Sequence, residues 1–273
     1  MLTSDTIWQQ ICQAARDESS PSESGVVRDN GGWTVRGPLG PEAENIAALF
    51  VPLLGPLPES RPLVVGHLAQ SLDGCIARED GESHWISGQE DLDHTHRLRA
   101  LCDAVLVGAG TVLKDDCRLT GRRCEGQNPL RVVLDPKASV PPESALFSDA
   151  TAPTLWITGS TGSEPVQPLG ETVDILTLPC EGGRFDLDRV LSALADRGVR
   201  RLFVEGGGFT ITRFLKAGLM DRLHIAMAPI FMGSGRSSTQ EALGQSLADC
   251  PRPQVSVYPM GCDWLFDCEF RQG

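Results

Sequence analysis

Short apolar runs alternate with segments of helical periodicity along most of this chain. Runs bounded by glycine, proline or polar residues are typical of buried strands. They predict strands at 63–69, 104–108, 131–135, 154–158, 173–178, 202–205, 222–228, 254–258 and 264–270. The earlier strands alternate with helices, whereas the last ones follow one another directly. This order predicts a mixed α/β sheet, parallel in its centre and antiparallel at its C-terminal edge, with helices on both faces.

The helices between these strands have recognisable boundaries. Apolar residues along one side predict a helix over 89–101. Asp186 is suited to cap the N-terminus of a second helix, which ends near Asp196. A third helix should begin at the glycines that follow strand 202–205 and run through Leu215.

Residues 1–60 differ from the rest of the chain. We expect an amphipathic helix over 7–15, a small hairpin over 26–35 and a helix over 46–54. No catalytic constellation is visible in this part. We therefore predict an N-terminal accessory extension over 1–60 and one main domain over 61–273.

The composition is that of a soluble globular protein. The 273 residues are 41% hydrophobic and 22% charged, with a net charge of −12. Lysine and arginine form no long cluster, so neither nucleic acid nor a membrane surface is expected as a partner. No apolar stretch approaches the ~20 residues that span a bilayer, and the first residues lack the order of a signal peptide. We expect a cytoplasmic protein.

Cysteine and histidine usage gives no sign of a metal site. The nine cysteines are odd in number, and none forms a Cys-x-x-Cys pair, which argues against structural zinc and a disulfide framework. We expect them to be reduced and mostly buried, with Cys75 and Cys117 as exceptions. His94 and His96 would face different directions on a helix, so we expect helix-surface histidines and no metal.

The glycine-rich end of strand 202–205 is the strongest candidate for chemistry. Glu205 ends an apolar run, and Gly206-Gly207-Gly208 then opens a helix. Glycine lets the backbone approach a ligand closely, and the first amides of a helix suit a phosphate. Glu205 would lie at the carboxyl end of its strand, where open α/β sheets place ligands. The segment predicts a site where a phosphorylated molecule meets a carboxylate.

A second glycine-bearing strand end precedes Thr111. The segment Gly108-Ala109-Gly110 lacks the third glycine of a dinucleotide-binding fingerprint. Thr111 adds a hydroxyl for a ribose or phosphate, and Asp115-Asp116 follows. For Asp116 a ligand contact and a solvated turn are equally supported.

Other candidates are a polar loop and several arginines. Ser83 and Trp85 lie in a loop that is either a rim for a flat ring or a surface loop with an anchoring tryptophan. Arginine grips phosphate with two parallel hydrogen bonds. One arginine on helix 89–101 and one after the acidic pair are therefore candidates for phosphate binding, and the others are expected at the surface.

Taken in order, these segments resemble the reductase domain of riboflavin biosynthesis, the C-terminal domain of bacterial RibD, which has a dihydrofolate-reductase-like fold. The matching motifs recur in family order across 62–273. They lie at 68–74, 81–87, 96–100, 103–120, 204–208, 214–221 and 228–229. The ordered set is highly specific, although each motif alone is weak.

The resemblance implies an oxidoreductase that uses NADPH to reduce the ribosyl group of a 5-amino-6-(5-phosphoribosylamino)uracil-type pyrimidine to ribityl. It implies a homodimer and hydride transfer to C1′ of an opened imine. The implied cofactor residues are Trp85, Thr111, Asp115, Gly207, Gly208, Phe209, Thr210, Ile211, Thr212 and Arg213. The implied substrate residues are Ser83, Arg99, Leu119, Arg122 and Glu205. Glu205 is the implied catalytic residue, which would orient the substrate and stabilise the cationic imine.

The sequence departs from the family pattern at three positions. Cys75 replaces the usual basic residue, Cys117 replaces a proline, and Pro136 replaces a serine. The deaminase domain found in many bacterial members is absent from these 273 residues. The deaminated pyrimidine, its 2,5-diamino precursor and a related compound therefore all remain candidate substrates.

Two alternatives remain open. A dihydrofolate-type or other NADPH reductase of the same fold would explain Cys75 without loss of the cofactor segments. A non-catalytic nucleotide-binding regulator would use 1–60 to contact a partner. The presence of Thr111, Asp115, Glu205 and the arginines argues against the regulator.

Overall fold

The computed structural model describes residues 1–17, 24–29, 32–83, 86–160 and 170–270. The chain divides into two compact units. The first consists of Met1–Glu59 and Glu125–Gln127, and the second of Ser60–Cys124 and Asn128–Gly273. The sequence suggested a boundary after residue 60, but it gave no indication that 125–127 belongs with the N-terminal segment.

The first unit contains the elements expected for it, with one change of boundary. Helix α1 spans Ser4–Asp17, and strands β1 (Gly25–Asp29) and β2 (Gly32–Arg36) pair antiparallel. Helix α2 spans Pro41–Phe50 and continues as the 3₁₀ helix η1, Val51–Leu54. The expected start at residue 46 is therefore wrong, because proline fits the first turn of a helix, where its missing N–H is not needed.

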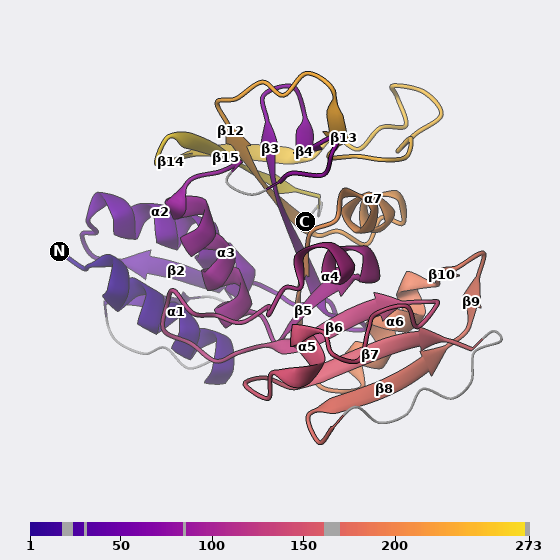
Figure 1. The fold of residues 1–273 in the computed structure, drawn as a ribbon. Helices are drawn as coiled ribbons and strands as arrows, with labels where there is room; N and C mark the ends of the chain where they lie inside the picture. The colour runs from indigo at the N-terminus through magenta and orange to yellow at the C-terminus, as the bar shows by residue number, and fades with distance from the viewer. Residues whose placement is uncertain (18–23, 30–31, 84–85, 161–169, 271–273) are drawn as a thin grey trace. The chain divides into compact units, whose positions relative to one another are not determined.

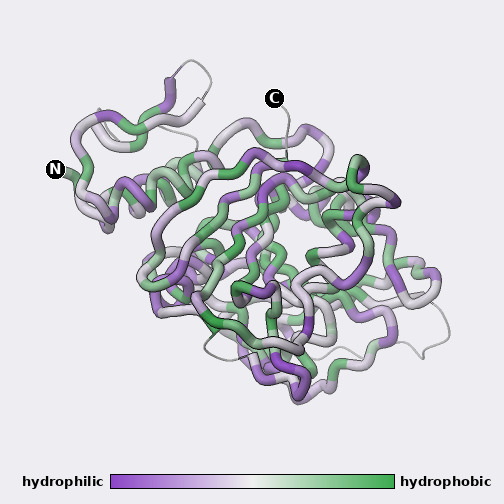
Figure 2. The backbone as a smooth tube through the Cα atoms, turned by 90° about the horizontal axis from the view of Figure 1, so that it is seen from above, coloured by the Kyte–Doolittle hydropathy of each residue, from purple (hydrophilic) through white to green (hydrophobic). Residues whose placement is uncertain are grey.

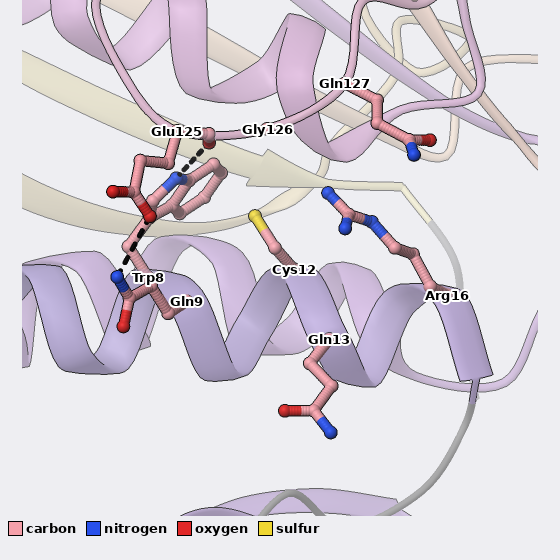
Figure 3. Close-up of a pocket in the computed structure, with 8 residues that line it drawn as sticks. All are labelled: Trp8, Gln9, Cys12, Gln13, Arg16, Glu125, Gly126 and Gln127. Carbon is pink, nitrogen blue, oxygen red and sulfur yellow. Dashed lines mark hydrogen bonds between the residues drawn. The ribbon is translucent and has the colours of Figure 1, made fainter.

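Residues 125–127 are held by side chains of α1. Trp8 Nε1 donates to the Glu125 carbonyl oxygen over 2.8 Å, and Gln9 Nε2 donates to Glu125 Oε2 over 2.9 Å (Figure 3). A pocket of about 520 Å³ lies beside these bonds. The two hydrogen bonds explain why this short segment belongs to the first unit.

The second unit is built on a nine-stranded sheet in the order β14-β15-β12-β3-β11-β5-β6-β7-β8 (Figure 1). Strands β12 to β8 in this order run parallel, whereas β15 and β14 are antiparallel. Their bounds are β3 Leu63–Ser71, β5 Ala104–Gly108, β6 Leu130–Asp135, β7 Thr154–Gly159, β8 Val173–Leu178, β11 Arg201–Glu205, β12 Arg222–Ala228, β14 Gln254–Met260 and β15 Asp263–Glu269. The predicted mixed α/β sheet is confirmed.

Helices cover both faces of this sheet. Helices α6 (Leu187–Ala195) and α7 (Gly208–Lys216) pack their apolar side chains on one face, within a core that includes Leu106, Val132 and Phe214. Helix α3 (Gln89–Leu101) contacts the other face through side chains of β3 and β11. In Figure 2 the hydrophobic stretches gather in the interior of this unit, and hydrophilic residues occupy many of its outer loops.

The sequence missed the short elements of this unit. Helices α4 (Ala109–Asp115) and α5 (Ala145–Ser148) were not among the expected elements. Two small hairpins pair β4 (Cys75–Arg78) with β13 (Gly235–Ser237) and β9 (Cys180–Glu181) with β10 (Arg184–Phe185). Elements this short carry too few residues for a periodicity to be visible. At α6 the prediction is confirmed, because the Asp186 side chain accepts from the Asp188 N–H.

The cysteines differ from expectation in burial. Of the nine, only four are buried, at positions 12, 75, 102 and 268. Cys262 is exposed, because it lies in the turn between the edge strands β14 and β15. Among the helices that the structure describes, none has the length and apolar character needed to cross a membrane.

Candidate functional site

The two glycine-bearing strand ends lie side by side. Strands β11 and β5 are parallel neighbours, so Glu205 and Gly108 end at the same edge of the sheet. Gly206 and Gly207 have φ values of 74° and 60°, a region that favours glycine. A Cβ on Gly207 would lie 3.3 Å from Thr111 Oγ1. The turns before α7 and α4 thus approach each other closely, and the first amides of α7 point out beside them.

A cavity of about 870 Å³ opens at these turns within the second unit. Most residues predicted for the site contribute to its walls. They are Ser83, Arg99, Thr111, Asp115, Arg122, Glu205, Gly207, Gly208, Phe209, Thr210 and Arg213. Side chains that are far apart in sequence are therefore brought to one cavity large enough for a dinucleotide or a drug-sized ligand.

Three predicted residues within the described part of the chain are not found on these walls. Ile211 and Thr212 are fully buried, and Thr212 Oγ1 donates to the Gly208 carbonyl oxygen over 2.6 Å. Leu119 is buried with a φ of 54°. Because α7 is amphipathic, the side chains at 211 and 212 face the core. Trp85 lies outside the described residues.

Glu205 is held by Arg99 of α3. Arg99 Nε donates to Glu205 Oε2 over 2.6 Å, and its Nη2 donates to Oε1. Burial alone would lower the pKa of Arg99, but the charge and hydrogen bonds of Glu205 raise it above its ordinary value. A third donor, Nη1, binds the Thr120 carbonyl oxygen over 3.1 Å. All three guanidinium nitrogens of Arg99 are therefore engaged within the protein, and Arg99 is better placed to orient Glu205 than to bind a phosphate.

Arg122 supplies a positive charge near Glu205. It is exposed on the cavity wall, and its Nη1 donates to Thr120 Oγ1 over 2.8 Å. Partial burial lowers the pKa of Arg122, and the neighbouring Arg99 and Arg118 lower it further. A bound anion would offset the electrostatic repulsion between these neighbouring arginines.

A second group of cations lies near α7. Arg213 Nη2 donates to the Phe185 carbonyl oxygen over 2.5 Å, and the Arg184 guanidinium lies 5.2 Å from the centre of the Phe209 ring. Burial lowers the pKa of Arg213, and Arg184 lowers it further. Phosphate groups fit both cationic regions, one beside Glu205 and one beside the start of α7.

The structure corrects the interpretation of the histidines on α3. His94 is 1% exposed, and its Nε2 lies 2.9 Å from His224 Nδ1. His96 Nδ1 accepts from the Arg122 N–H over 2.9 Å. Burial, followed by the charges of Arg99 and Arg122, lowers the pKa of His96 to about 4. These histidines are buried because α3 is covered on more than one side, which the helix pattern alone does not reveal.

Sequence reasoning also missed His67, Ser87 and Asp91. His67 Nε2 donates to Asp91 Oδ1 over 2.8 Å, and Ser87 Oγ donates to Asp91 Oδ2 over 2.6 Å. All three line the same cavity as Glu205. The available signal was a histidine in the middle of an apolar strand, which is an unusual place for a polar residue.

The residues that depart from the family pattern occupy different places. Cys75 is buried in β4, where its Sγ lies 3.8 Å from the Gly233 carbonyl oxygen. Cys117 and Pro136 line the cavity. Burial and then Glu205 raise the pKa of the Cys117 thiol to about 12, so the thiol is neutral. Asp116 is structural: it ends α4 with a φ of 41°, and its Oδ1 accepts from the Ala145 N–H over 2.8 Å.

Comparison with known proteins identifies the family of the chain. A family model described as the RibD C-terminal domain matches residues 62–266. A 2,5-diamino-6-ribosylamino-4(3H)-pyrimidinone 5′-phosphate reductase of Methanothermobacter thermautotrophicus is 36% identical over 76% of this chain and 97% of its own length. The riboflavin biosynthesis protein RibD of Aquifex aeolicus is 37% identical over 66% of this chain, which spans about half (49%) of that relative.

A solved structure has the same fold. The deaminase and 5-amino-6-(5-phosphoribosylamino)uracil reductase of Thermotoga maritima aligns with a TM-score of 0.66 and 26% identity. The alignment covers 87% of this chain and 64% of that protein. With the family match over most of the second unit, these findings show that the chain belongs to the RibD C-terminal domain family.

Proposed function

We propose that the chain is an NADPH-dependent oxidoreductase that reduces the ribosyl group of a pyrimidine ribosylamine 5′-phosphate to ribityl, as in riboflavin biosynthesis. The observation that carries this proposal is Glu205, held by Arg99 at a cavity between two glycine-bearing strand ends. The name of the Methanothermobacter thermautotrophicus relative, a pyrimidinone phosphate reductase of which the chain covers 97%, supports it.

The chain fits a dinucleotide beside the two glycine turns. Thr111 and the first amides of α7 are placed to bind its phosphates, and Arg213 adds a positive charge. Asp115 is placed on the wall of the same cavity for a ribose hydroxyl. When bound, the nicotinamide would supply hydride to the substrate. The cations beside α7 favour NADPH over NADH, because only NADPH carries a 2′-phosphate.

The substrate fits the region around Glu205. Arg122 would bind its 5′-phosphate, and Ser83 lies on the cavity wall, where Lys114 Nζ is 3.4 Å from its Oγ. Opening of the ribosylamine ring produces a cationic imine. Glu205, a carboxylate fixed in place by Arg99, would stabilise that charge, which is absent from the ground state.

The proposal extends to assembly and location. We propose a homodimer, supported by the exposed apolar side chains of Val255, Val257 and Trp264 on the edge strands β14 and β15. We propose a cytoplasmic location, supported by cysteines that are odd in number and contain no Cys-x-x-Cys pair.

Incubation with NADPH and single candidate substrates tests the proposed function. The substrates are the 2,5-diamino pyrimidinone phosphate, its deaminated uracil counterpart and dihydrofolate. We expect NADPH oxidation and a ribityl product with at least one of the two pyrimidines and none with dihydrofolate. Turnover of dihydrofolate would favour the dihydrofolate-type alternative, and NADPH binding without any turnover would favour a nucleotide-binding regulator.

A further inference from the structure

A row of polar side chains crosses the centre of the main sheet. Strand registers place Glu205 of β11 beside His67 of β3, His67 beside His224 of β12, and His224 beside Asp267 of β15. Residues in register on neighbouring strands point to the same face of a sheet. We call these four residues the polar row. His67 is the one polar side chain in 63–69 of β3, and 202–204 of β11 are apolar, so the row is not a general property of these strands.

Helix α3 provides a charged or polar partner for each part of the polar row that it covers. Arg99 binds Glu205, Asp91 binds His67, and His94 lies 2.9 Å from His224 through ring nitrogens. Of the three residues of the row nearest to α3, only Glu205 and His67 line the cavity. The row therefore places a histidine and a carboxylate next to each other at the proposed reaction site.

His67 is fixed in a single orientation. Its side chain is 6% exposed and that of Asp91 is 3% exposed. Burial would raise the pKa of Asp91, but the charge and hydrogen bond of His67, and then the hydrogen bond from Ser87, lower it. Asp91 is thus a carboxylate and accepts from Nε2–H. The other ring nitrogen, Nδ1, is therefore the one that can exchange a proton with a ligand in the cavity.

We propose that His67, oriented by Asp91, is a second catalytic residue and the general acid that opens the sugar ring. The proposal rests on the proposed function. The lone pair of the nitrogen that is bonded to C1′ forms the C1′=N bond as the C1′–O4′ bond breaks. The Nδ1 proton of the His67 imidazolium moves to O4′. The hydroxyl on C4′ and the cationic imine result, with the imine beside Glu205. When bound, NADPH would supply the hydride that C1′ accepts, and solvent would return a proton to His67.

The charges around His67 suit this role. The groups that face it are Asp91 and His94 of α3, Glu205 of β11, which is paired with Arg99, and His224 of β12. Burial holds the pKa values of His94 and His224 below their ordinary value. These two rings are therefore neutral near pH 7, and Asp91 and Glu205 are the two carboxylates that lie beside His67.

The variant His67→Gln tests the role, because glutamine keeps an N–H donor for Asp91 but has no proton to transfer. We expect kcat on the pyrimidine substrate to fall by about 100-fold or more, with NADPH affinity unchanged. The wild type should lose kcat/KM as pH rises through one ionisation, and His67→Gln should lack that ionisation. With NADPH deuterated at the transferred position, the isotope effect should fall toward unity in the variant, because ring opening becomes rate-limiting.

His224→Gln is the matched control, since it changes a buried histidine of the same row that does not line the cavity. It should keep the pH profile of the wild type. If His67→Gln fails to fold, Asp91→Asn provides the test, because loss of the carboxylate should move the ionisation to lower pH. Wild-type turnover in His67→Gln, or a loss of turnover with the ionisation retained, would overturn the inference. Absence of pyrimidine reduction by the wild type would instead refute the proposed function.

Discussion

Glu205 owes its proposed role to the residues that surround it. Two guanidinium nitrogens of Arg99 fix both carboxylate oxygens, and Arg99 is itself fixed by the Thr120 carbonyl oxygen. A carboxylate that is already oriented needs no reorganisation when a positive charge develops next to it. Arg99 of α3 thus orients the Glu205 carboxylate, and the exposed Arg122 is available to bind a phosphate.

Glu205→Gln tests this role at the residue scale. The carboxamide keeps the shape of the side chain but removes the negative charge, so kcat should fall by about 100-fold or more. NADPH affinity, measured by calorimetry, should change little, because Glu205 is assigned to the substrate. A collapse of NADPH affinity with kcat retained would contradict the assignment.

His96 makes the stability of the folded protein depend on pH. Its pKa is 6.5 in the unfolded chain and about 4 in the folded protein, so the unfolded chain binds the proton first as pH falls. The stability it contributes is fully present above pH 6.5 and is lost as pH falls toward about 4. The His96→Gln variant keeps an acceptor for the Arg122 N–H. Its urea unfolding midpoints at about pH 7 and about pH 5 should differ less than those of the wild type. An equal difference in both proteins would contradict this.

At the scale of elements, the strand ends and the helices that follow them form the cofactor side of the cavity. Gly207 precedes α7 in the left-handed region, and a Cβ there would meet Thr111 Oγ1 at 3.3 Å. Gly108, before α4, is similarly close to Thr210 Oγ1, at 3.0 Å. Neither position has room for a branched side chain without movement of the opposite turn.

Gly207→Val should therefore lower NADPH affinity by about 10-fold or more, through strain and through the space the side chain occupies. Gly218→Val is the matched control: it has a similar φ of 67°, but no atom lies within 4 Å of its Cβ. It should lose stability and retain NADPH affinity. Equal affinity in the two variants would place the cofactor elsewhere.

The N-cap of α6 offers a test of local stability. The Asp186 side chain accepts from the Asp188 N–H over 3.0 Å. Asp186→Ala should lower the free energy of unfolding by about 1 kcal/mol, whereas Asp186→Asn should retain the cap. Urea denaturation measures both values. If Asp186→Asn loses more unfolding free energy than Asp186→Ala, the cap does not act through its hydrogen bond.

At the scale of the whole molecule, the sequence predicted the sheet and the glycine turns because local patterns encode them. The helix over 89–101 and the strand over 104–108 have the expected bounds. The pairing of His67 with Asp91 and the burial of His94 were not predictable from these patterns. They depend on strand register and on how α3 lies on the sheet, which are contacts between residues distant in sequence.

The edge strands β14 and β15 allow a test of assembly. Val257 is 46% exposed there, and Val257→Lys should shift the protein from dimer to monomer in light scattering coupled to size exclusion. Leu247→Lys, at an exposed loop position, should leave the mass unchanged. A dimer that survives Val257→Lys would place the interface on another surface.

The most direct test follows deuterium from the cofactor into the product. The wild-type protein would be incubated with NADPH deuterated at the transferred position and each pyrimidine ribosylamine phosphate in turn. The account predicts a ribityl product with deuterium on C1′. Oxidation of NADPH with no deuterium on that carbon, or no reaction with either pyrimidine, would contradict it.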